Sequence, residues 1–123
     1  MSSGRGIVLF GHGSRDPGWR QPMDAVARSI AARDPQARVT CAFLEMQQPD
    51  LGAAVDAMVA SGARSIVVLP MFLGVGKHLR EDLPRLVEAA RERHPRVPLH
   101  VLPSAGESQA LVDLLANLAL EGS

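Results

Sequence analysis

Short apolar runs alternate with helical stripes along this sequence, and that alternation limits the folds open to it. Four runs are expected to form strands, at residues 6–10, 38–43, 65–69 and 97–102. After each run, apolar residues recur at the spacing of one helix face; the stripes span 23–31, 51–59, 83–90 and 111–118. A β-α order repeated four times predicts an α/β fold, a four-stranded parallel sheet with right-handed crossovers and helices on both faces.

The expected order of the strands follows from their burial. Runs 6–10 and 65–69 are continuously apolar, which is typical of central strands covered on both faces. Pro98 suits an edge strand or a strand start, because proline cannot donate to a ladder. We therefore expect a truncated flavodoxin-like order, 2-1-3-4, with a ligand site beyond the carboxyl ends of strands 1 and 3.

Pro84 affects where the third helix is expected to begin. It has no N–H, so we place it in the first turn and start that helix no earlier than about Arg80. The connection after the third strand would then run from about Pro70 to Arg80. Connections in α/β units are usually about 2–6 residues long, and longer irregular ones are often functional.

Length and composition exclude several classes of protein. A chain of 123 residues suits one domain, here expected to cover 1–123. Thirteen basic residues balance thirteen acidic ones, so bulk charge favours neither nucleic acid nor an anionic membrane. The single Cys41 excludes an intramolecular disulfide. The apolar run at 7–10 is too short for a signal-peptide core or a membrane span, which favours a cytoplasmic location.

Three residues with metal-binding side chains follow strand ends. His12 stands between Gly11 and Gly13 after the first strand, Glu45 ends the second, and His78 lies in the expected connection after the third. Parallel strands place all three at one sheet edge, where two imidazoles and a carboxylate can bind a divalent ion such as Fe²⁺, Co²⁺, Ni²⁺ or Zn²⁺. Structural alternatives remain open, since His12 also suits a turn and Glu45 a helix cap.

The other candidates carry weaker signals. His94 reads as the end of the third helix, His100 as an edge-strand residue, and Cys41 as a small buried hydrophobe. Gly74-Val75-Gly76-Lys77 resembles the tail of a phosphate loop but lacks its first glycine and its final Ser or Thr.

Three motifs resemble the sirohydrochlorin chelatase family. They are Gly11-His12-Gly13-Ser14-Arg15-Asp16-Pro17, then Ala42-Phe43-Leu44-Glu45 followed by Pro49, and Leu69-Pro70-Met71-Phe72-Leu73-Gly74-Val75-Gly76-Lys77-His78. The likeness covers essentially the whole chain and is to the short, single-domain class II type. It implies a homodimeric lyase that inserts cobalt, iron or nickel into a tetrapyrrole, in cobalamin or sirohaem biosynthesis. His12 and His78 match the family's metal-binding histidines and Glu45 its acidic partner.

The resemblance also implies how the substrate is held. Sirohydrochlorin carries eight carboxylates, which cations beside the site can bind. The candidates are Arg15, Arg20, Lys77 and Arg80, and of these Arg20 suits a solvated surface cation better. Apolar loop residues are expected to pack on the macrocycle; these are Met46, Phe72, Leu73 and Val75. No tightly bound cofactor and no ATP are expected, with the divalent metal entering as substrate.

Two other functions fit part of the pattern. A non-catalytic carrier of metal or tetrapyrrole would use every one of the same ligands. A phosphatase would use His12 as nucleophile and Arg15 on phosphate, although that chemistry normally begins with Arg-His-Gly and here Gly11 precedes the histidine.

Overall fold

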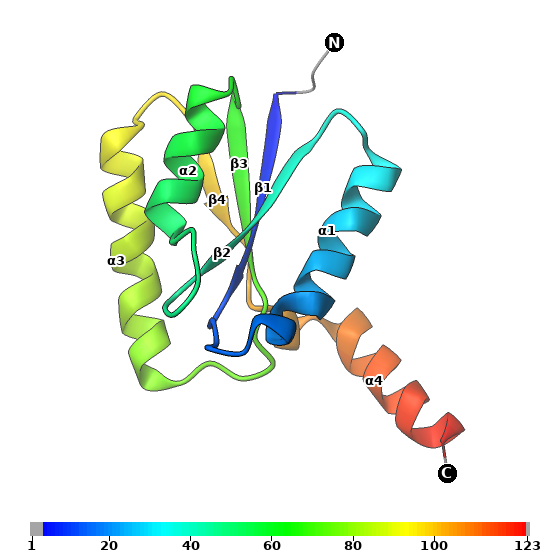
Figure 1. Cartoon of the computed structure of the whole chain (residues 1–123). Coiled ribbons are helices and arrows are strands. Elements are labelled where there is room, and N and C mark those ends of the chain that lie inside the picture. Colours follow the sequence, from blue (N-terminus) through cyan, green and yellow to red (C-terminus); the bar gives the residue numbers. More distant parts are fainter. Residues whose placement is uncertain (1–3, 123) are drawn as a thin grey trace.

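Four parallel strands form one sheet in the computed structural model, which describes residues 4–122. The strands are β1 (Arg5–Gly11), β2 (Arg38–Phe43), β3 (Ser65–Pro70) and β4 (Leu99–Val101), in the order β2-β1-β3-β4 (Figure 1). Ile7 of β1 lies opposite Val39 of β2 and Val67 of β3, and this register brings the carboxyl ends of the strands to one edge. The predicted α/β class and strand order are confirmed.

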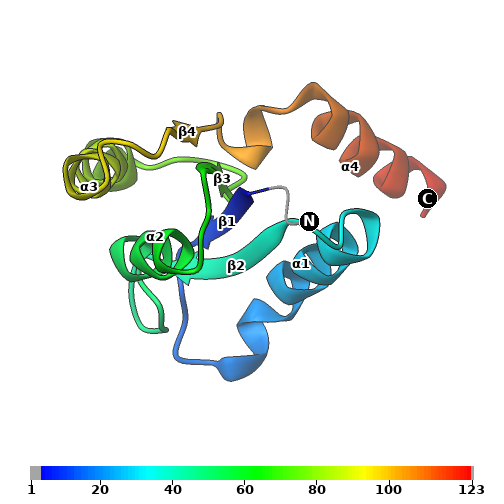
Figure 2. The same cartoon turned by 90° about the horizontal axis from the view of Figure 1, so that it is seen from above.

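Three of the four helices in residues 4–122 cover the two faces of the sheet. The four helices are α1 (Gln21–Arg33), α2 (Leu51–Ala60), α3 (Lys77–Arg93) and α4 (Gln109–Glu121), with short 3₁₀ turns η1 (Pro17–Arg20) and η2 (Ala105–Glu107). α1 covers one face, and α2 and α3 cover the other (Figure 2). The Asp50 carboxylate caps α2 by accepting from the Ala53 N–H at 2.8 Å, and Ser108 caps α4 in the same way.

Two apolar cores hold these layers together. The larger one joins the sheet to α2 and α3 and includes Phe10, Leu51 and Val68, all at most 1% exposed. The smaller one joins the sheet to α1 and consists of Leu9, Met23, Cys41 and Phe43. Burial of this apolar surface is the main force that stabilises the layered arrangement. Cys41 is buried, as its sequence position predicted.

The fourth strand is shorter than expected, three residues in place of 97–102. Pro98 contributes only its carbonyl, which accepts from the Ile66 N–H at 2.9 Å. Leu102 still donates its N–H to the Val68 carbonyl beyond the strand end, at 2.9 Å. β4 is an edge strand that begins directly after Pro98, as predicted, but the predicted length of the strand was wrong.

The expected start of the third helix was also wrong. α3 begins at Lys77, with Pro84 in its interior, and the Arg80 N–H already donates to the Gly76 carbonyl at 3.1 Å. An interior proline costs about 3 kcal/mol because it removes one helix hydrogen bond. Leu79 offsets this cost: its side chain is buried in the larger core and fixes the first turn. The connection after β3 is consequently only residues 71–76.

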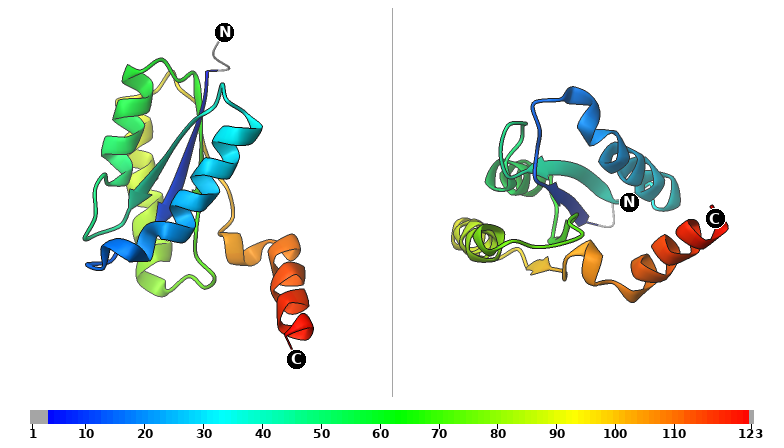
Figure 3. Two further views of the ribbon diagram at one scale, coloured as in Figure 1. Left: turned by 45° about the vertical axis from the view of Figure 1, so that its right-hand side comes forward. Right: turned by 90° about the horizontal axis from the view of Figure 1, so that it is seen from below.

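The last helix does not cover the sheet. α4 leaves the body of the molecule beyond the carboxyl edge of the strands, and none of its described residues is buried (Figures 1 and 3). Its leucine stripe faces solvent, with Leu114 53% and Leu118 57% exposed. Within residues 4–122, no helix is both long and apolar enough to cross a membrane.

Candidate functional site

Backbone hydrogen bonds between the β1 and β2 segments continue past the strand ends and bring the side chains of His12 and Glu45 into contact. Leu44 donates its N–H to the Gly11 carbonyl at 2.9 Å, and Glu45 donates to the His12 carbonyl at 3.1 Å. Nε2 of His12 then lies 3.0 Å from Oε1 of Glu45, and the two side chains are 56% and 50% exposed. His12 and Glu45 therefore meet at the sheet edge, as predicted.

Gly13 makes this close approach of the two loops feasible. Its φ is +96°, and a Cβ built on it would lie 1.8 Å from the Glu45 carbonyl oxygen. No L-residue fits there without moving the backbone of one loop. The Ser14 N–H donates to Oε1 of Gln47 at 3.3 Å, so the loops are joined a second time on the far side of Gly13.

His78 is placed differently from the sequence prediction. It lies in the first turn of α3, not in an irregular connection, and its side chain is exposed at the same sheet edge. The structure does not bring it into the His12–Glu45 pair. Across the described residues 4–122, no group of three His, Cys, Asp or Glu side chains is arranged to hold a metal ion.

The residues expected to bind the tetrapyrrole fall into two groups. Five have exposed side chains around the edge, and these are Arg15, Met46, Leu73, Lys77 and Arg80. Phe72 and Val75 are half-buried against the larger core, and the Phe72 ring meets Phe10 edge-on at 6.1 Å between centroids. Phe72 and Val75 therefore pack against the core in the absence of a ligand.

Arg20 packs against the edge of the smaller core. Its Nε is 3.1 Å from Oδ2 of Asp24, and its guanidinium carbon lies 4.7 Å from the centroid of the Phe43 ring. A paired cation stacked on an aromatic face is held by its neighbours and is not available to a distant carboxylate.

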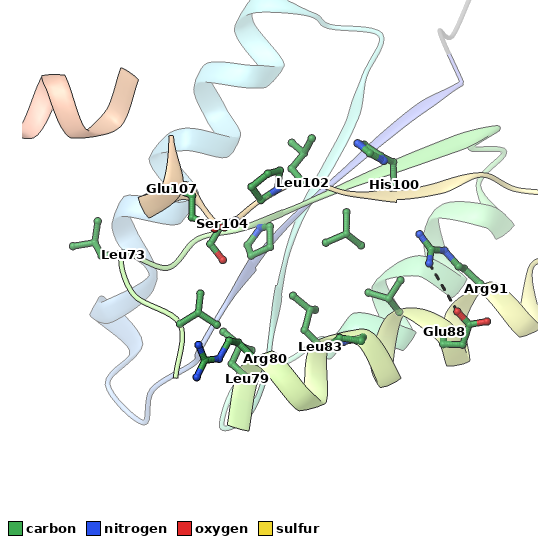
Figure 4. A pocket seen from close by; sticks show the side chains of 16 residues that line it. Leu73, Leu79, Arg80, Leu83, Glu88, Arg91, His100, Leu102, Ser104 and Glu107 are labelled. Atoms are coloured by element: carbon green, nitrogen blue, oxygen red, sulfur yellow. Dashed lines mark hydrogen bonds and ion pairs between the residues drawn. The ribbon is translucent and has the colours of Figure 1, made fainter. Parts of the chain in front are cut away.

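A cavity of about 690 Å³ opens between α3 and β4 (Figure 4). Three of the predicted substrate residues line it: Leu73, Val75 and Arg80. His12, Glu45 and His78 do not line it, so the predicted metal ligands lie outside the cavity. Apolar side chains of α3, including Leu79, Leu83 and Val87, form one wall.

Apart from Arg80, the polar residues of this cavity were not predicted from the sequence. They are Glu88, Arg91, His100, Ser104 and Glu107. Nη2 of Arg91 donates to the Leu99 carbonyl at 2.7 Å, a contact that depends on α3 lying over β4. No local pattern marks these residues, because only the packing of α3 against the edge strand gathers them. His100 alone carried a signal, as a histidine in an expected edge strand.

His94 and Asp56 form a second histidine–carboxylate pair, at the opposite end of α3. Nε2 of His94 lies 2.6 Å from Oδ1 of Asp56 on α2, and Arg93 is 3.1 Å from the same oxygen. The hydrogen bond from His94 lowers the pKa of Asp56, with Arg93 adding to the effect. The pair joins two helices, and His94 caps the end of α3 as the sequence predicted.

The His12 and Glu45 side chains are of the types that bind divalent metal ions. One imidazole nitrogen and one carboxylate are a suitable pair for a borderline divalent ion, and a half-exposed setting leaves coordination positions open. A carboxylate at this distance is also able to accept a proton. The sheet order, the helix placement and this exposed pair at the carboxyl edge define the chelatase-like class of α/β domains.

The chain belongs to the CbiX family, whose sequence model matches residues 6–121. A sirohydrochlorin cobaltochelatase from Methanococcoides burtonii is 28% identical over 129 residues, covering 98% of each chain. One from Methanopyrus kandleri is 36% identical over 81 residues, which are 66% of this chain and 57% of the relative.

Solved structures agree with this assignment. A CbiX protein from Marinobacter aquaeolei has a TM-score of 0.81 at 26% identity, and the match covers 96% of both chains. The sirohydrochlorin chelatase SirB from Bacillus subtilis subspecies spizizenii, in complex with cobalt, has a TM-score of 0.79 at 26% identity. That match covers 98% of this chain and 51% of the SirB chain.

Proposed function

We propose that this chain inserts a divalent metal ion, cobalt, iron or nickel, into sirohydrochlorin or a related tetrapyrrole without ATP. The observation that carries the proposal is the His12–Glu45 pair, 3.0 Å apart at the carboxyl edge of a CbiX-family sheet. Relatives of the chain are named sirohydrochlorin cobaltochelatases, and SirB structures contain cobalt or Fe³⁺. The product would feed cobalamin or sirohaem biosynthesis.

The proposed reaction exchanges two protons for one ion. A divalent ion loses water ligands, two pyrrole N–H groups each release a proton, and four ring nitrogens bind the metal. We infer that His12 and His78 would hold the ion through neutral imidazole nitrogens at about 2.1 Å, and for this the His78 side chain would have to approach the His12–Glu45 pair when the ion binds. Glu45 either binds the ion or accepts a ring proton. No redox partner is needed, and no cofactor stays bound.

The substrate's carboxylates are assigned to the exposed cations of the edge. Arg15 in the loop after β1 and Lys77 and Arg80 in the first turn of α3 are exposed, and there they can form charge-assisted hydrogen bonds to acetate or propionate groups. The exposed Met46 and Leu73 side chains, 57% and 72% accessible, provide apolar contact for the macrocycle.

We further propose that residues 1–123 act as one chelatase domain within a homodimer, with the two sites near the interface. The support is the length of SirB, of which this chain matches only 51%. Two copies of the chain would supply a domain for each half of such a protein. A cytoplasmic location stays a prediction from the sequence.

Anaerobic insertion assays with Co²⁺, Fe²⁺ or Ni²⁺, followed by the absorption of the tetrapyrrole, test the activity. His12→Ala and His78→Ala should each lower the insertion rate more than 100-fold, because each removes a proposed metal ligand. Both variants should still fold, because both side chains are exposed. His94→Ala is the matched control, since His94 lies at the far end of α3. Insertion at a near-normal rate by either site variant would refute the ligand assignment.

Glu45→Gln separates the two roles of the carboxylate. Glutamine keeps an oxygen ligand but does not accept the proton, so a base role predicts normal cobalt binding and a slow insertion step. A carrier would bind cobalt and tetrapyrrole with no turnover above the uncatalysed rate. A phosphatase would hydrolyse p-nitrophenyl phosphate without added metal, and that result would replace the proposal.

A further inference from the structure

The largest aromatic side chain of the molecule has no role in the site described so far. Trp19 is the chain's single tryptophan, and the sequence has no tyrosine. It lies in η1, in the connection from β1 to α1, and it is 40% exposed. Aromatic rings dominate the energetics of cores and of binding sites because they bury so much apolar area. A tryptophan left this exposed still has a large apolar surface available for a ligand.

The ring of Trp19 lies against the ends of β1 and β2. Its Cη2 atom would be 3.3 Å from a Cβ built on Gly11, the last residue of β1. The centroid of its ring is 6.3 Å from that of Phe43, the last residue of β2. Gly11 directly precedes His12, and Phe43 stands two residues before Glu45. The indole therefore reaches the same edge of the sheet as the His12–Glu45 pair.

The backbone that carries the indole is held by its own hydrogen bonds. Oδ1 of Asp16 accepts from the Gly18 N–H at 2.9 Å, and the Trp19 N–H donates to the Asp16 carbonyl at 3.1 Å. The Asp16 N–H in turn donates to Oγ of Ser14 at 3.0 Å. The position of Trp19 is thus fixed before any ligand arrives, and a preorganised side chain loses little conformational entropy when it binds.

Exposed apolar residues occur once in each of three neighbouring connections. In the described residues 4–122, each connection that leaves the carboxyl end of β1, β2 or β3 presents one large exposed apolar side chain, and these are Trp19, Met46 and Leu73. Single exposed apolar residues scattered over a surface are normal, whereas several grouped around one edge are typical of a binding site. The grouping places Trp19 with the two residues already assigned to the macrocycle.

The indole offers a polar contact as well as an apolar one. No group in residues 4–122 accepts a hydrogen bond from Nε1–H of Trp19. Tryptophan combines an apolar ring with one donor at its rim. That combination suits a ligand with a flat apolar centre and carboxylates at its periphery, because the ring can pack on the centre while the N–H donates to a carboxylate.

We propose that Trp19 binds the tetrapyrrole, with its exposed ring packed on the macrocycle from the α1 side of the site and its indole N–H donating to one peripheral carboxylate. Met46 and Leu73 contact the macrocycle from the connections after β2 and β3. Trp19 contributes to the affinity for the tetrapyrrole and not to the affinity for the metal. This inference rests on the proposed function and adds a residue that positions the substrate there.

Cobalt-insertion kinetics and titrations with metal-free sirohydrochlorin test the contact. Trp19→Ala should raise both the KM and the dissociation constant for sirohydrochlorin at least about tenfold, because stacking on an aromatic ring is lost. Its kcat and its Co²⁺ binding should stay close to those of the wild type. Trp19→Phe keeps a ring but has no N–H, so both constants should lie between those of the wild type and of Trp19→Ala.

Met23→Ala is the matched control for a loss of packing alone. The Met23 side chain meets the same position above Gly11 as the indole does, but it is only 5% exposed and so is out of reach of a ligand. Its KM for sirohydrochlorin should stay close to the wild-type value at a temperature where all variants are folded.

Nuclear magnetic resonance of the wild type provides a test that needs no variant. The single tryptophan gives one indole N–H signal. Metal-free sirohydrochlorin should shift this signal strongly, because the ring current of the macrocycle acts on a group in contact with it. An indole signal that stays in place while the amide signals of residues 11–15 move would show that the macrocycle binds away from Trp19, and would overturn the proposal.

The other outcomes separate this inference from the proposed function. Unchanged constants in Trp19→Ala would overturn the contact, and so would an equal loss in Met23→Ala, since packing alone would then explain the effect. Weaker Co²⁺ binding by Trp19→Ala would also overturn it, because the indole would then act through the fold of the His12 loop. A wild type that binds sirohydrochlorin without inserting metal would overturn the proposed function only, and the dissociation constants of the variants would still decide the role of Trp19.

Discussion

Replacing Gly13 by alanine tests the claim that contact between two loops builds the site. The added Cβ would lie 1.8 Å from the Glu45 carbonyl oxygen, and real Cβ atoms essentially never come within 3.0 Å of such an atom. The loops must therefore separate by at least about 1.2 Å. The φ of +96° adds strain of about 1–2 kcal/mol for a residue with a Cβ.

Separation of the loops also breaks the hydrogen bond from the Glu45 N–H to the His12 carbonyl. A lost bond of this type costs about 1 kcal/mol, so the total expected loss is about 2–3 kcal/mol. For a domain of this length the melting temperature should fall by about 8–12 °C. The insertion rate should fall further than stability accounts for, since the 3.0 Å pairing of the His12 and Glu45 side chains depends on this contact.

Gly74→Ala is the matched control for this substitution. No heavy atom lies within 4 Å of the Cβ that would be added at Gly74. Thermal denaturation followed by circular dichroism, together with anaerobic insertion assays at a temperature where both variants are folded, makes the comparison. A Gly13→Ala protein that melts within 2 °C of the wild type and keeps its rate would refute the account of the site.

Two further predictions concern α3. Pro84→Ala should stabilise the protein by about 1–2 kcal/mol, seen as a higher urea midpoint, because it restores a helix N–H to the Arg80 carbonyl; an unchanged or lower midpoint would contradict that reasoning. Asp56→Asn should cost about 0.5 kcal/mol at pH 6, a small value because the Asp56 side chain is 50% exposed. Since His94 lowers the pKa of Asp56, this contribution is present above the carboxyl's unfolded pKa of about 3.9 and disappears as pH falls below it. If the wild type and Asp56→Asn have equal urea midpoints at pH 6, the His94–Asp56 pair does not stabilise the fold.

Alternation of strand runs and helix stripes was enough to predict the sheet, because each run must bury its apolar side chains. The order β2-β1-β3-β4 followed from the continuous runs at 6–10 and 65–69 and from Pro98 at an edge. The proximity of His12 and Glu45 was also predictable, since adjacent parallel strands end at the same edge. Local rules failed at Pro84, where burial of Leu79 outweighed the helix-breaking preference of proline.

Periodicity identified the leucine stripe of α4 but could not say what the stripe packs against. That depends on η2, which Gly106 fixes to the Phe72–Leu73 backbone from more than thirty residues away in the sequence. The cavity between α3 and β4 likewise exists only once a helix and an edge strand are packed together. The sequence by itself determined the elements, the sheet order and the edge that carries His12 and Glu45, because these depend on local burial patterns and chain topology. Only the tertiary structure decided where α3 begins, which residues line the cavity and that α4 stands apart from its own sheet, because each depends on contacts between segments far apart in the chain.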